Sequence, residues 1–348
     1  MYKLLLCWRY LLTRYLAMAC IVSVMLGVAT LIVVNSVMSG FSTKLKDRLH
    51  GLLSDIVVEA PSYDGFPDPE GKMAAIRSDP FLDERIEAMT ATMEVFAMLQ
   101  FQVNGHTITR PVHLIGIDPE GRARIGGFAE HLVRQKNSAK PSFDLTAEGK
   151  RHNYEINHRP RLVWDNFPQP VQSNPDPREP PPPDPPPSTP HVPRGVILGF
   201  ALGHVRQTNP DTGKPEDVPI LQEGDEVVLT TLSGQRLAPV FDRFTVCDFI
   251  KTEMSDYDAN YVFMPLDHLQ HLRTTEGRVT SIQVRLKERK DAEAVQRRLQ
   301  ALFPAPAYNV LRWEQKQGAI LAAISIEKGL LNVLLFLIIA VAGFGILA

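Results

Sequence analysis

The chain has 348 residues, enough for two or three domains, and 44% of them are hydrophobic and 22% charged. Its formal net charge is −2, and no basic patch interleaved with aromatic residues occurs, which argues against a nucleic-acid-binding protein. Of the three cysteines, Cys7, Cys20 and Cys247, only the last lies in the central region, which therefore cannot form an internal disulfide.

A long uncharged stretch lies near the N-terminus, from Tyr15 to Thr43. About 20 apolar residues suffice to cross the hydrocarbon core of a membrane, so the stretch is long enough to span it. A signal peptide is the alternative interpretation, because basic residues precede the stretch, but the apolar run exceeds the length of a signal core. We therefore predict a cytoplasmic N-terminus at 1–14 and an uncleaved transmembrane helix at 15–40.

A second uncharged stretch runs from Gly329 to Ala348 and predicts another transmembrane helix at 324–348. Two spans place both termini on the same side of the membrane. The charges that flank the first span give slight support to a cytoplasmic N-terminus, so residues 41–323 are expected to form an extracytoplasmic domain.

The first half of this domain mixes strand and helix signals. We expect a strand at 55–60, a short helix at 68–82, and a hairpin over 85–118 that turns at Asn104–Gly105. Within the hairpin, Pro111 predicts an edge position or a bulge, because proline cannot donate to a strand ladder. Residues 118–121 (DPEG) are expected to form a turn, followed by a short helix.

The second half continues this α+β pattern. Strand, helix and strand follow one another between 278 and 313, in the order of one half of a ferredoxin-like fold. From Trp313 onward the sequence predicts a helix that runs without a break into the second span. Ordered structure is expected to resume at 194–204, with strands over 223–235, 236–250 and 259–266 and a helix over 267–275.

A proline-rich segment interrupts the domain, because almost half of the residues from 166 to 193 are proline. Such a segment cannot form a helix or a central strand, and polyproline II or disorder is expected. It could be a ligand for a proline-binding groove, but we favour a surface insertion that makes 138–193 one exposed excursion.

No catalytic motif is present in the sequence. It lacks the phosphate loop of nucleotide hydrolases and the nucleophile elbow of hydrolases. His268 and His271 lie three residues apart on an expected helix, but no third ligand follows at a suitable spacing for zinc, and we interpret them as a solvated face. We therefore predict a protein without catalytic residues, metal or cofactor, which binds or transmits rather than catalyses.

Two parts of the sequence carry a further signal. The first is LGVATLIVVNSVMSGFSTKLKDRL, from Leu26 to Leu49. The second runs from Gly195 to Ala348 and includes LQEGDEVVLTTLSG and the Glu327–Lys328 pair before the second span. Both resemble lipoprotein-releasing (Lol-type) ABC transporter permeases of the MacB/FtsX-like superfamily. Cys247–Asp248 depart from the usual glycine region, and the proline-rich insertion is not part of the family pattern.

The resemblance implies a fold and a topology. Such permeases carry a MacB-like periplasmic domain with a βαβ-rich part, split in sequence, and an inserted β-rich part. Here the split part would comprise 55–125 and 278–313, and the inserted part 194–277. Family members continue past the second span with a cytoplasmic segment and two more spans, so the resemblance implies a chain truncated to the N-terminal half of a permease.

The resemblance also implies function and partners. The family lifts lipoproteins from the inner membrane and passes them to a periplasmic carrier, while a separate cytoplasmic ATPase dimer hydrolyses ATP. A second permease subunit, or the missing C-terminal half, would complete the transporter. The first span of the family lines the lipid cleft, which makes Met38, Phe41, Leu45 and Leu49 candidates for lipid contact; packing against neighbouring helices is the alternative.

One paralogue of the family holds the carrier with a protruding loop. The matching stretch here, 233–243, is short, and Gln235, Arg236 and Pro239 are its candidates for carrier contact. Two other functions remain open on the sequence. One is a MacB/FtsX-like permease that exports another substrate or regulates cell-wall enzymes, and the other is a two-span periplasmic sensor.

Overall fold

The computed structural model describes residues 15–52, 54–103, 105–158, 194–210, 213–234 and 237–347. The chain divides into two compact units, a helical unit and a body that spans Leu52–Arg312. Each unit is described by itself.

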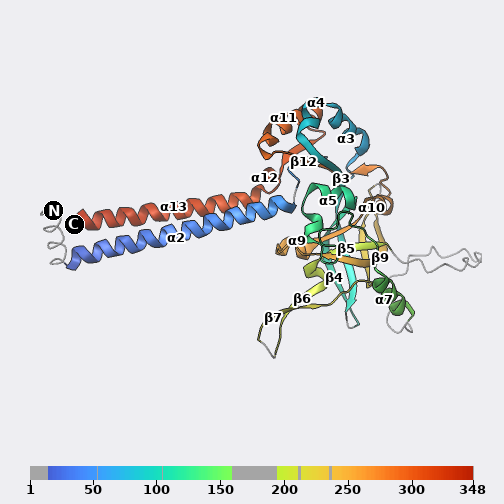
Figure 1. The fold of residues 1–348 in the computed structure, drawn as a ribbon, viewed down its shortest axis with the longest axis horizontal. Coiled ribbons are helices and arrows are strands. Elements are labelled where there is room, and N and C mark those ends of the chain that lie inside the picture. The colour runs from blue at the N-terminus through green and yellow to red at the C-terminus, as the bar shows by residue number, and fades with distance from the viewer. Residues whose placement is uncertain are drawn as a thin grey trace, which may run out of the picture. The chain divides into compact units, whose positions relative to one another are not determined.

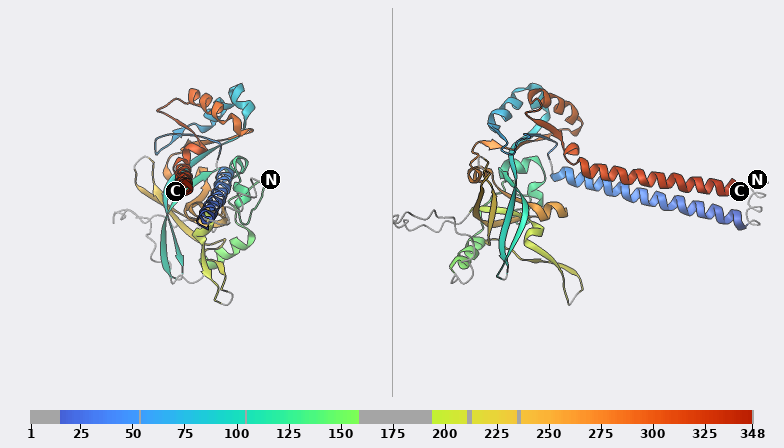
Figure 2. Two further views of the ribbon diagram at one scale, coloured as in Figure 1. Left: turned by 90° about the vertical axis from the view of Figure 1, so that its left-hand side faces the viewer. Right: turned by 180° about the vertical axis from the view of Figure 1, so that it is seen from behind.

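Two long helices form the helical unit, α2 (Tyr15–Leu52) and α13 (Gly318–Leu347), with the short α12 (Trp313–Lys316) before the second. Helices α2 and α13 lie side by side and antiparallel (Figures 1 and 2). A Cβ atom on Gly27 would lie 3.1 Å from Cγ2 of Ile338. The segments Met25–Lys44 and Leu321–Ile338 are long and apolar enough to cross a membrane, by length and composition.

The helix expected from Trp313 onward is not continuous. Helix α12 ends at Lys316 and α13 begins at Gly318, with Gln317 between them. Glycine is a poor helix former, which favours a break at this position.

One part of the body is a ferredoxin-like layer of sheet and helices. Its strand order is β13-β1-β12-β3, in which β1 runs antiparallel to both β12 and β13. The connections β1–α3–α4–β3 and β12–α11–β13 are therefore the two halves of a split βαβ motif, and the expected ferredoxin-like half over 278–313 is present. The elements are β1 (Ile56–Glu59), α3 (Pro69–Ser78), α4 (Pro80–Arg85), β3 (Ile86–Val103), β12 (Ser281–Leu286), η2 (Arg289–Asp291), α11 (Ala292–Leu302) and β13 (Asn309–Arg312).

Helices α3, α4 and α11 cover one face of this sheet (Figure 1). Alternate strand residues and the apolar stripes of the helices form one buried core between the two layers. Its central members are Ile56, Val58, Ile76, Leu82, Val284, Val295 and Leu299. The small ladder of β2 (Phe66–Pro67) and β11 (Arg278–Val279) lies beside this part of the body.

Six strands of the described chain close into a barrel. The order β3-β4-β10-β5-β9-β8 is closed by a further pairing of β3 with β8, at Met98 opposite Thr230. Pro111 on β4 pairs with β3 but lies beyond β10, which starts opposite His113, so its predicted edge position is confirmed. The elements are β4 (His106–Ile117), β5 (Gly195–Gly199), β8 (Glu226–Leu232), β9 (Pro239–Ile250) and β10 (Tyr261–Pro265).

The barrel corrects the expected division of the domain. We expected the β-rich part to be confined to 194–277, but β3 and β4 supply two of the barrel strands. The first residues of β3 pair with β12 of the ferredoxin-like part, and its later residues pair with β8. One strand is therefore shared by both parts, and no linker separates them.

Short helices surround the barrel wall. Helix α5 (Pro119–Ile125) replaces the turn expected at 118–121, because Asp118 accepts a hydrogen bond from the Gly121 amide and caps the helix. The remaining helices near the barrel are α6 (Phe128–His131), α8 (Phe200–Gly203), α9 (Ser255–Asn260) and α10 (Leu266–Arg273).

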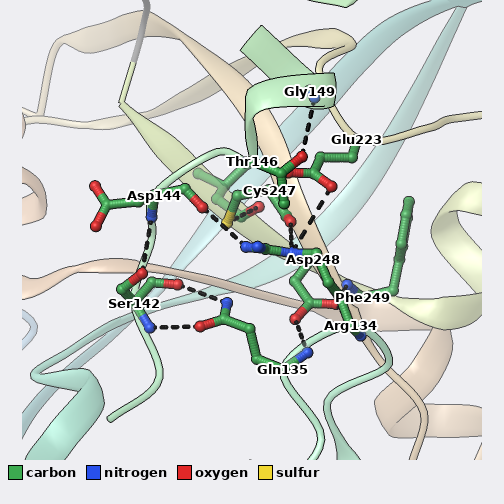
Figure 3. A network of polar contacts seen from close by, with 11 residues as sticks. Arg134, Gln135, Ser142, Asp144, Thr146, Gly149, Glu223, Cys247, Asp248 and Phe249 are labelled. Atoms are coloured by element: carbon green, nitrogen blue, oxygen red, sulfur yellow. Dashed lines mark hydrogen bonds and ion pairs between the residues drawn. The ribbon is translucent and has the colours of Figure 1, made fainter. Parts of the chain in front are cut away.

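The segment before the proline-rich insertion is packed against the barrel. Figure 3 shows Asp248 of β9 accepting hydrogen bonds from the amides of Arg134 (2.8 Å) and Gln135 (3.0 Å). The Arg134 side chain donates to the carbonyl oxygens of Cys247 (3.1 Å) and Asp144 (2.8 Å). The unusual Cys247–Asp248 pair therefore has a structural role, since it binds a neighbouring loop.

Helix α7 (Ala147–His158) is held at the same side of the barrel. The Asn153 side chain donates to the Gly224 carbonyl (2.9 Å), and His152 lies 3.0 Å from Asp225. The prediction of one exposed excursion over 138–193 is thus wrong for 138–158, where side-chain contacts with the turn before β8 order the chain. Residues 159–193, including the proline-rich run, lie outside the described residues.

Candidate functional site

Among the strands that the structure describes, the most exposed are those of a two-stranded hairpin, β6 (His204–Thr208) and β7 (Pro215–Pro219). Its strands pair from His204 opposite Pro219 to Thr208 opposite Pro215. Figures 1 and 2 show that the hairpin projects away from the barrel. Every residue of β7 is exposed. A projecting element with no core contribution is suited to binding rather than to stabilising the fold.

The hairpin carries an apolar pair on one face. Val205 and Val218 lie directly opposite one another, and 46% and 39% of their respective surfaces are exposed. Directly paired residues of an antiparallel ladder point to the same face, so the two valines form one continuous apolar spot. Pro215 and Pro219 mark both ends of β7 and lack a donor, which hinders addition of another strand to this edge.

An aromatic cluster fixes the base of the hairpin. The His204 ring stacks on Phe200 at a centroid distance of 3.8 Å and meets Phe249 edge-on at 4.9 Å. Lys251 lies over the Phe200 ring and pairs with Asp217 of β7 at 3.1 Å. Ring stacking and an ion pair therefore hold the base of the hairpin to the barrel.

The histidine at this base should make the hairpin sensitive to acid. Burial among aromatic rings lowers the pKa of His204, although its hydrogen bond with the Phe200 carbonyl (3.0 Å) acts in the opposite direction. The nearby Asp217 favours the charged ring and Lys251 disfavours it. Because the unfolded chain binds the proton more readily, stability is full above the ordinary histidine pKa of about 6.5 and falls as the pH drops below it.

We expect hydrogen exchange of the β6–β7 amides, corrected for intrinsic rates, to accelerate between pH 7 and pH 5 in the intact chain. The variant His204→Phe keeps an aromatic ring on Phe200 but cannot titrate, and should lose most of this pH dependence. An equal acceleration in both proteins would show that other groups cause it.

Of the three predicted carrier-contact residues, the structure describes only Pro239. Gln235 and Arg236 lie outside the described residues. Pro239 is exposed and opens β9, where it pairs with Leu232 of β8. The described end of this stretch, 239–243, is thus the beginning of β9, whereas strands β6 and β7 project.

The sequence contained a signal for this hairpin that we did not use. Two short polar-apolar segments flank Asn209-Pro210 and Gly213, which are strong turn formers. A search for turn residues between matched segments would have indicated it.

Two of the predicted lipid-contact residues can be examined on α2. Phe41 is 57% exposed and Met38 is half-buried, while Ser42 beside them is buried within the described chain. Leu45 and Leu49 belong to the same helix, but their side chains lie outside the described residues. An exposed phenylalanine within an apolar helix is available to lipid or to another apolar helix.

The histidine pair on α10 has separate polar partners. His268 lies 3.0 Å from Asp242 and contacts Phe244, and the exposed His271 lies 3.4 Å from Glu276. No group of three potential metal ligands occurs among the residues that the structure describes.

Comparison with known proteins identifies relatives of the chain. The lipoprotein-releasing system transmembrane protein LolC of Xylella fastidiosa strain 9a5c is 23% identical over 342 residues, which cover 96% of this chain and 64% of LolC. LolC of strain Temecula1 matches to the same extent. This chain is a relative of the Lol-type ABC permeases. It spans 64% of the length of these curated relatives, and the resemblance seen in its sequence is confirmed.

No family model matches this chain. Among solved structures, the periplasmic region of MacB from Actinobacillus actinomycetemcomitans is 11% identical and aligns with a TM-score of 0.35, over 78% of this chain and 94% of its own. The extracellular domain of the transporter YknZ from Gram-positive bacteria gives the same TM-score, over 74% of this chain and all of its own.

Proposed function

We propose that this chain is a permease subunit of an ABC transporter that releases lipoproteins from the inner membrane. The observation that carries the proposal is the similarity to LolC over 96% of the chain, which includes both apolar helices as well as the body. Residues 15–40 and 324–348 cross the membrane, residues 1–14 are cytoplasmic, and 41–323 form the periplasmic domain.

The length of α2 supports this topology. Its 38 residues make a helix of about 57 Å, whereas the hydrocarbon core is about 30 Å thick. Roughly half of the helix must therefore continue outside the hydrocarbon. The charged residues from Lys44 onward assign this continuation to the end of the helix that leads into the body.

The way the chain joins the body supports a role in transmitting movement. Helix α2 ends four residues before β1, and α12 follows β13 directly. The first residue of β1, Ile56, pairs with the last residue of β13, Arg312. Both helices thus connect to neighbouring strands at one corner of the sheet, where a displacement of either helix acts on the same place.

The free energy needed to extract lipid chains from the membrane is the reason to propose an apolar cleft between spans. A lipid chain is held in the membrane by about 0.8 kcal/mol per CH₂ group, so a multiply acylated protein does not leave spontaneously. Met38, Phe41, Leu45 and Leu49 are the residues that we assign to lipid contact. This sequence carries no phosphate-binding loop, and we propose as partners a cytoplasmic ATPase dimer, which would supply the work, and a second permease subunit.

For the periplasmic carrier, the β6–β7 hairpin replaces 233–243 as the proposed contact. It projects, it is exposed, and its Val205–Val218 pair offers an apolar spot. A carrier of lipids presents an apolar opening to which such a spot is complementary.

Reconstitution provides the test of this function. The chain, its partner permease and an ATPase from the same cell would be placed in proteoliposomes that contain a fluorescent triacylated lipoprotein. We expect release into solution that requires ATP and added carrier, and that stops when the ATPase phosphate-loop lysine is replaced. Retention of the lipoprotein by a complex that still hydrolyses ATP would favour a permease for another substrate.

A further inference from the structure

A buried carboxylate lies at the corner where the chain passes from α2 into the body. Asp55 directly precedes β1, and only 2% of its surface is exposed. Its Oδ2 accepts a hydrogen bond from the Leu286 amide at 2.8 Å, and the Arg285 guanidinium lies 3.7 Å from the same oxygen. Burying a carboxylate is costly, so a residue that only linked helix to strand would gain nothing from a charge here.

The geometry of β12 provides the place for this carboxylate. The pairing of β12 with β3 shifts between Arg285 and Leu286, which is a bulge at the end of the strand. Bulges leave a backbone amide outside the regular ladder. Asp55 accepts a hydrogen bond from the Leu286 amide and so links the beginning of β1 to the end of β12, a central strand of the sheet.

The other connection to the helical unit leaves from β13, which has fewer strand partners than β1. Strand β13 is the edge of the sheet and pairs only with β1 among the described strands. The Gln296 side chain of α11 also donates to the Val310 carbonyl, at 2.9 Å. The two inputs to the body are therefore unequal, since β1 is paired on both sides and clamped at its start.

We propose that Asp55 is the positioning residue that couples the first span to the periplasmic body. With the clamp intact, a displacement of α2 moves β1 together with β12 and β3. Without it, the start of β1 loses this tie to the end of β12, and less of the displacement reaches the sheet. The proposal rests on the proposed transport function for its purpose, but the coupling itself exists whatever the transported substrate.

The test restrains the helices and observes the body in the full-length chain. Cysteines at Gly27 and Ile338, which face each other, would be oxidised to a disulfide in detergent micelles, with Cys7→Ser and Cys20→Ser in the background. Hydrogen exchange of the β1 amides and of Leu286 would then be compared between the oxidised and reduced forms.

We expect oxidation to slow exchange at these amides by about tenfold, as a typical coupling between two sites would. Asp55→Ala should reduce this ratio to less than about twofold, whereas Asp55→Asn, which keeps a carbonyl for the Leu286 amide, should retain an intermediate ratio. A merely structural residue would change the absolute exchange rates of both forms but not their ratio.

Asp258→Ala is the matched control. Asp258 is also buried and accepts one backbone amide, from Thr252 at 2.8 Å, and one side-chain hydroxyl, but it lies near the barrel. This variant should keep the tenfold ratio. The proposal is overturned if Asp55→Ala keeps that ratio, if Asp258→Ala loses it equally, or if the unsubstituted chain shows no response to oxidation. None of these readouts involves ATP, lipoprotein or carrier, so a failure of the transport assay leaves the result interpretable.

Discussion

Removal of the β6–β7 hairpin is expected to abolish transfer of lipoprotein to the carrier while the body remains folded. Residues 205–218 would be replaced by two glycines that join His204 to Pro219, which already face each other in the ladder. The aromatic base around Phe200 is kept and the ion pair between Asp217 and Lys251 is lost, while the β6 and β7 residues that are removed are all exposed. If the hairpin holds the central contact residues, transfer should fall at least about 30-fold, since such residues each contribute about 2 kcal/mol or more.

The transfer assay with proteoliposomes measures this loss, and ATP hydrolysis by the same complex is the internal control. The paired substitution Val205→Ser and Val218→Ser should reproduce most of the defect, because it removes the apolar spot and leaves the ribbon in place. Thr208→Ala, farther along the same strand, should behave as the unsubstituted chain. Transfer at the normal rate by the deletion variant would remove the hairpin from the carrier site.

Gly65→Ala is expected to be the most destabilising single substitution that we predict. Gly65 has a φ of +64°, and a Cβ atom there would lie 2.1 Å from the Val279 carbonyl oxygen. The left-handed conformation costs an alanine about 1–2 kcal/mol, and displacing a packed strand costs about 1–3 kcal/mol more. We therefore expect a loss of about 3 kcal/mol in the free energy of unfolding.

The buried Cys247 thiol offers a direct measurement of this loss. Burial raises its pKa and keeps it unreactive in the folded body, so labelling by a thiol reagent reports unfolding once Cys7 and Cys20 are replaced by serine. Gly105→Ala is the control, because Gly105 also has a positive φ (+80°) but a Cβ atom there would meet nothing within 4 Å. That control should lose only about 1–2 kcal/mol. Equal losses in the two variants would show that the contact with Val279 is not the cause.

Local patterns in the sequence predicted much of the ferredoxin-like part. Apolar residues over 278–313 recur with the periods of strand, helix and strand, so these elements could be predicted. The turn residues at 104–105 indicated the hairpin of β3 and β4. The tetrapeptide DPEG occurs twice, at 68–71 and 118–121, and begins a helix both times. We expected a helix at the first and a turn at the second. In both places the aspartate carboxylate caps the helix by accepting a hydrogen bond from the glycine amide, and the glycine leaves room for that carboxylate. The tetrapeptide therefore indicated a helix start at both positions.

The barrel could not be predicted in this way, because its closure joins residues far apart in the chain. Met98 pairs with Thr230, and the proline-rich segment 166–193 lies between them in the sequence. The composition of that segment suggested a boundary where the fold has none. Residues 138–158 were misjudged for a related reason. Their polar side chains indicate exposure, but Asn153 and His152 meet partners on the turn at 222–226 that only the folded chain brings near.

Strand β3 has a mechanical consequence for the proposed transporter. Its 18 residues extend for about 60 Å, and they belong first to the sheet that carries both helix connections and then to the barrel wall. If a flexible linker joined the two parts, the ferredoxin-like part could move without moving the barrel. Because one continuous strand belongs to both, a small rotation of the ferredoxin-like part should produce a larger displacement at the far end of the barrel.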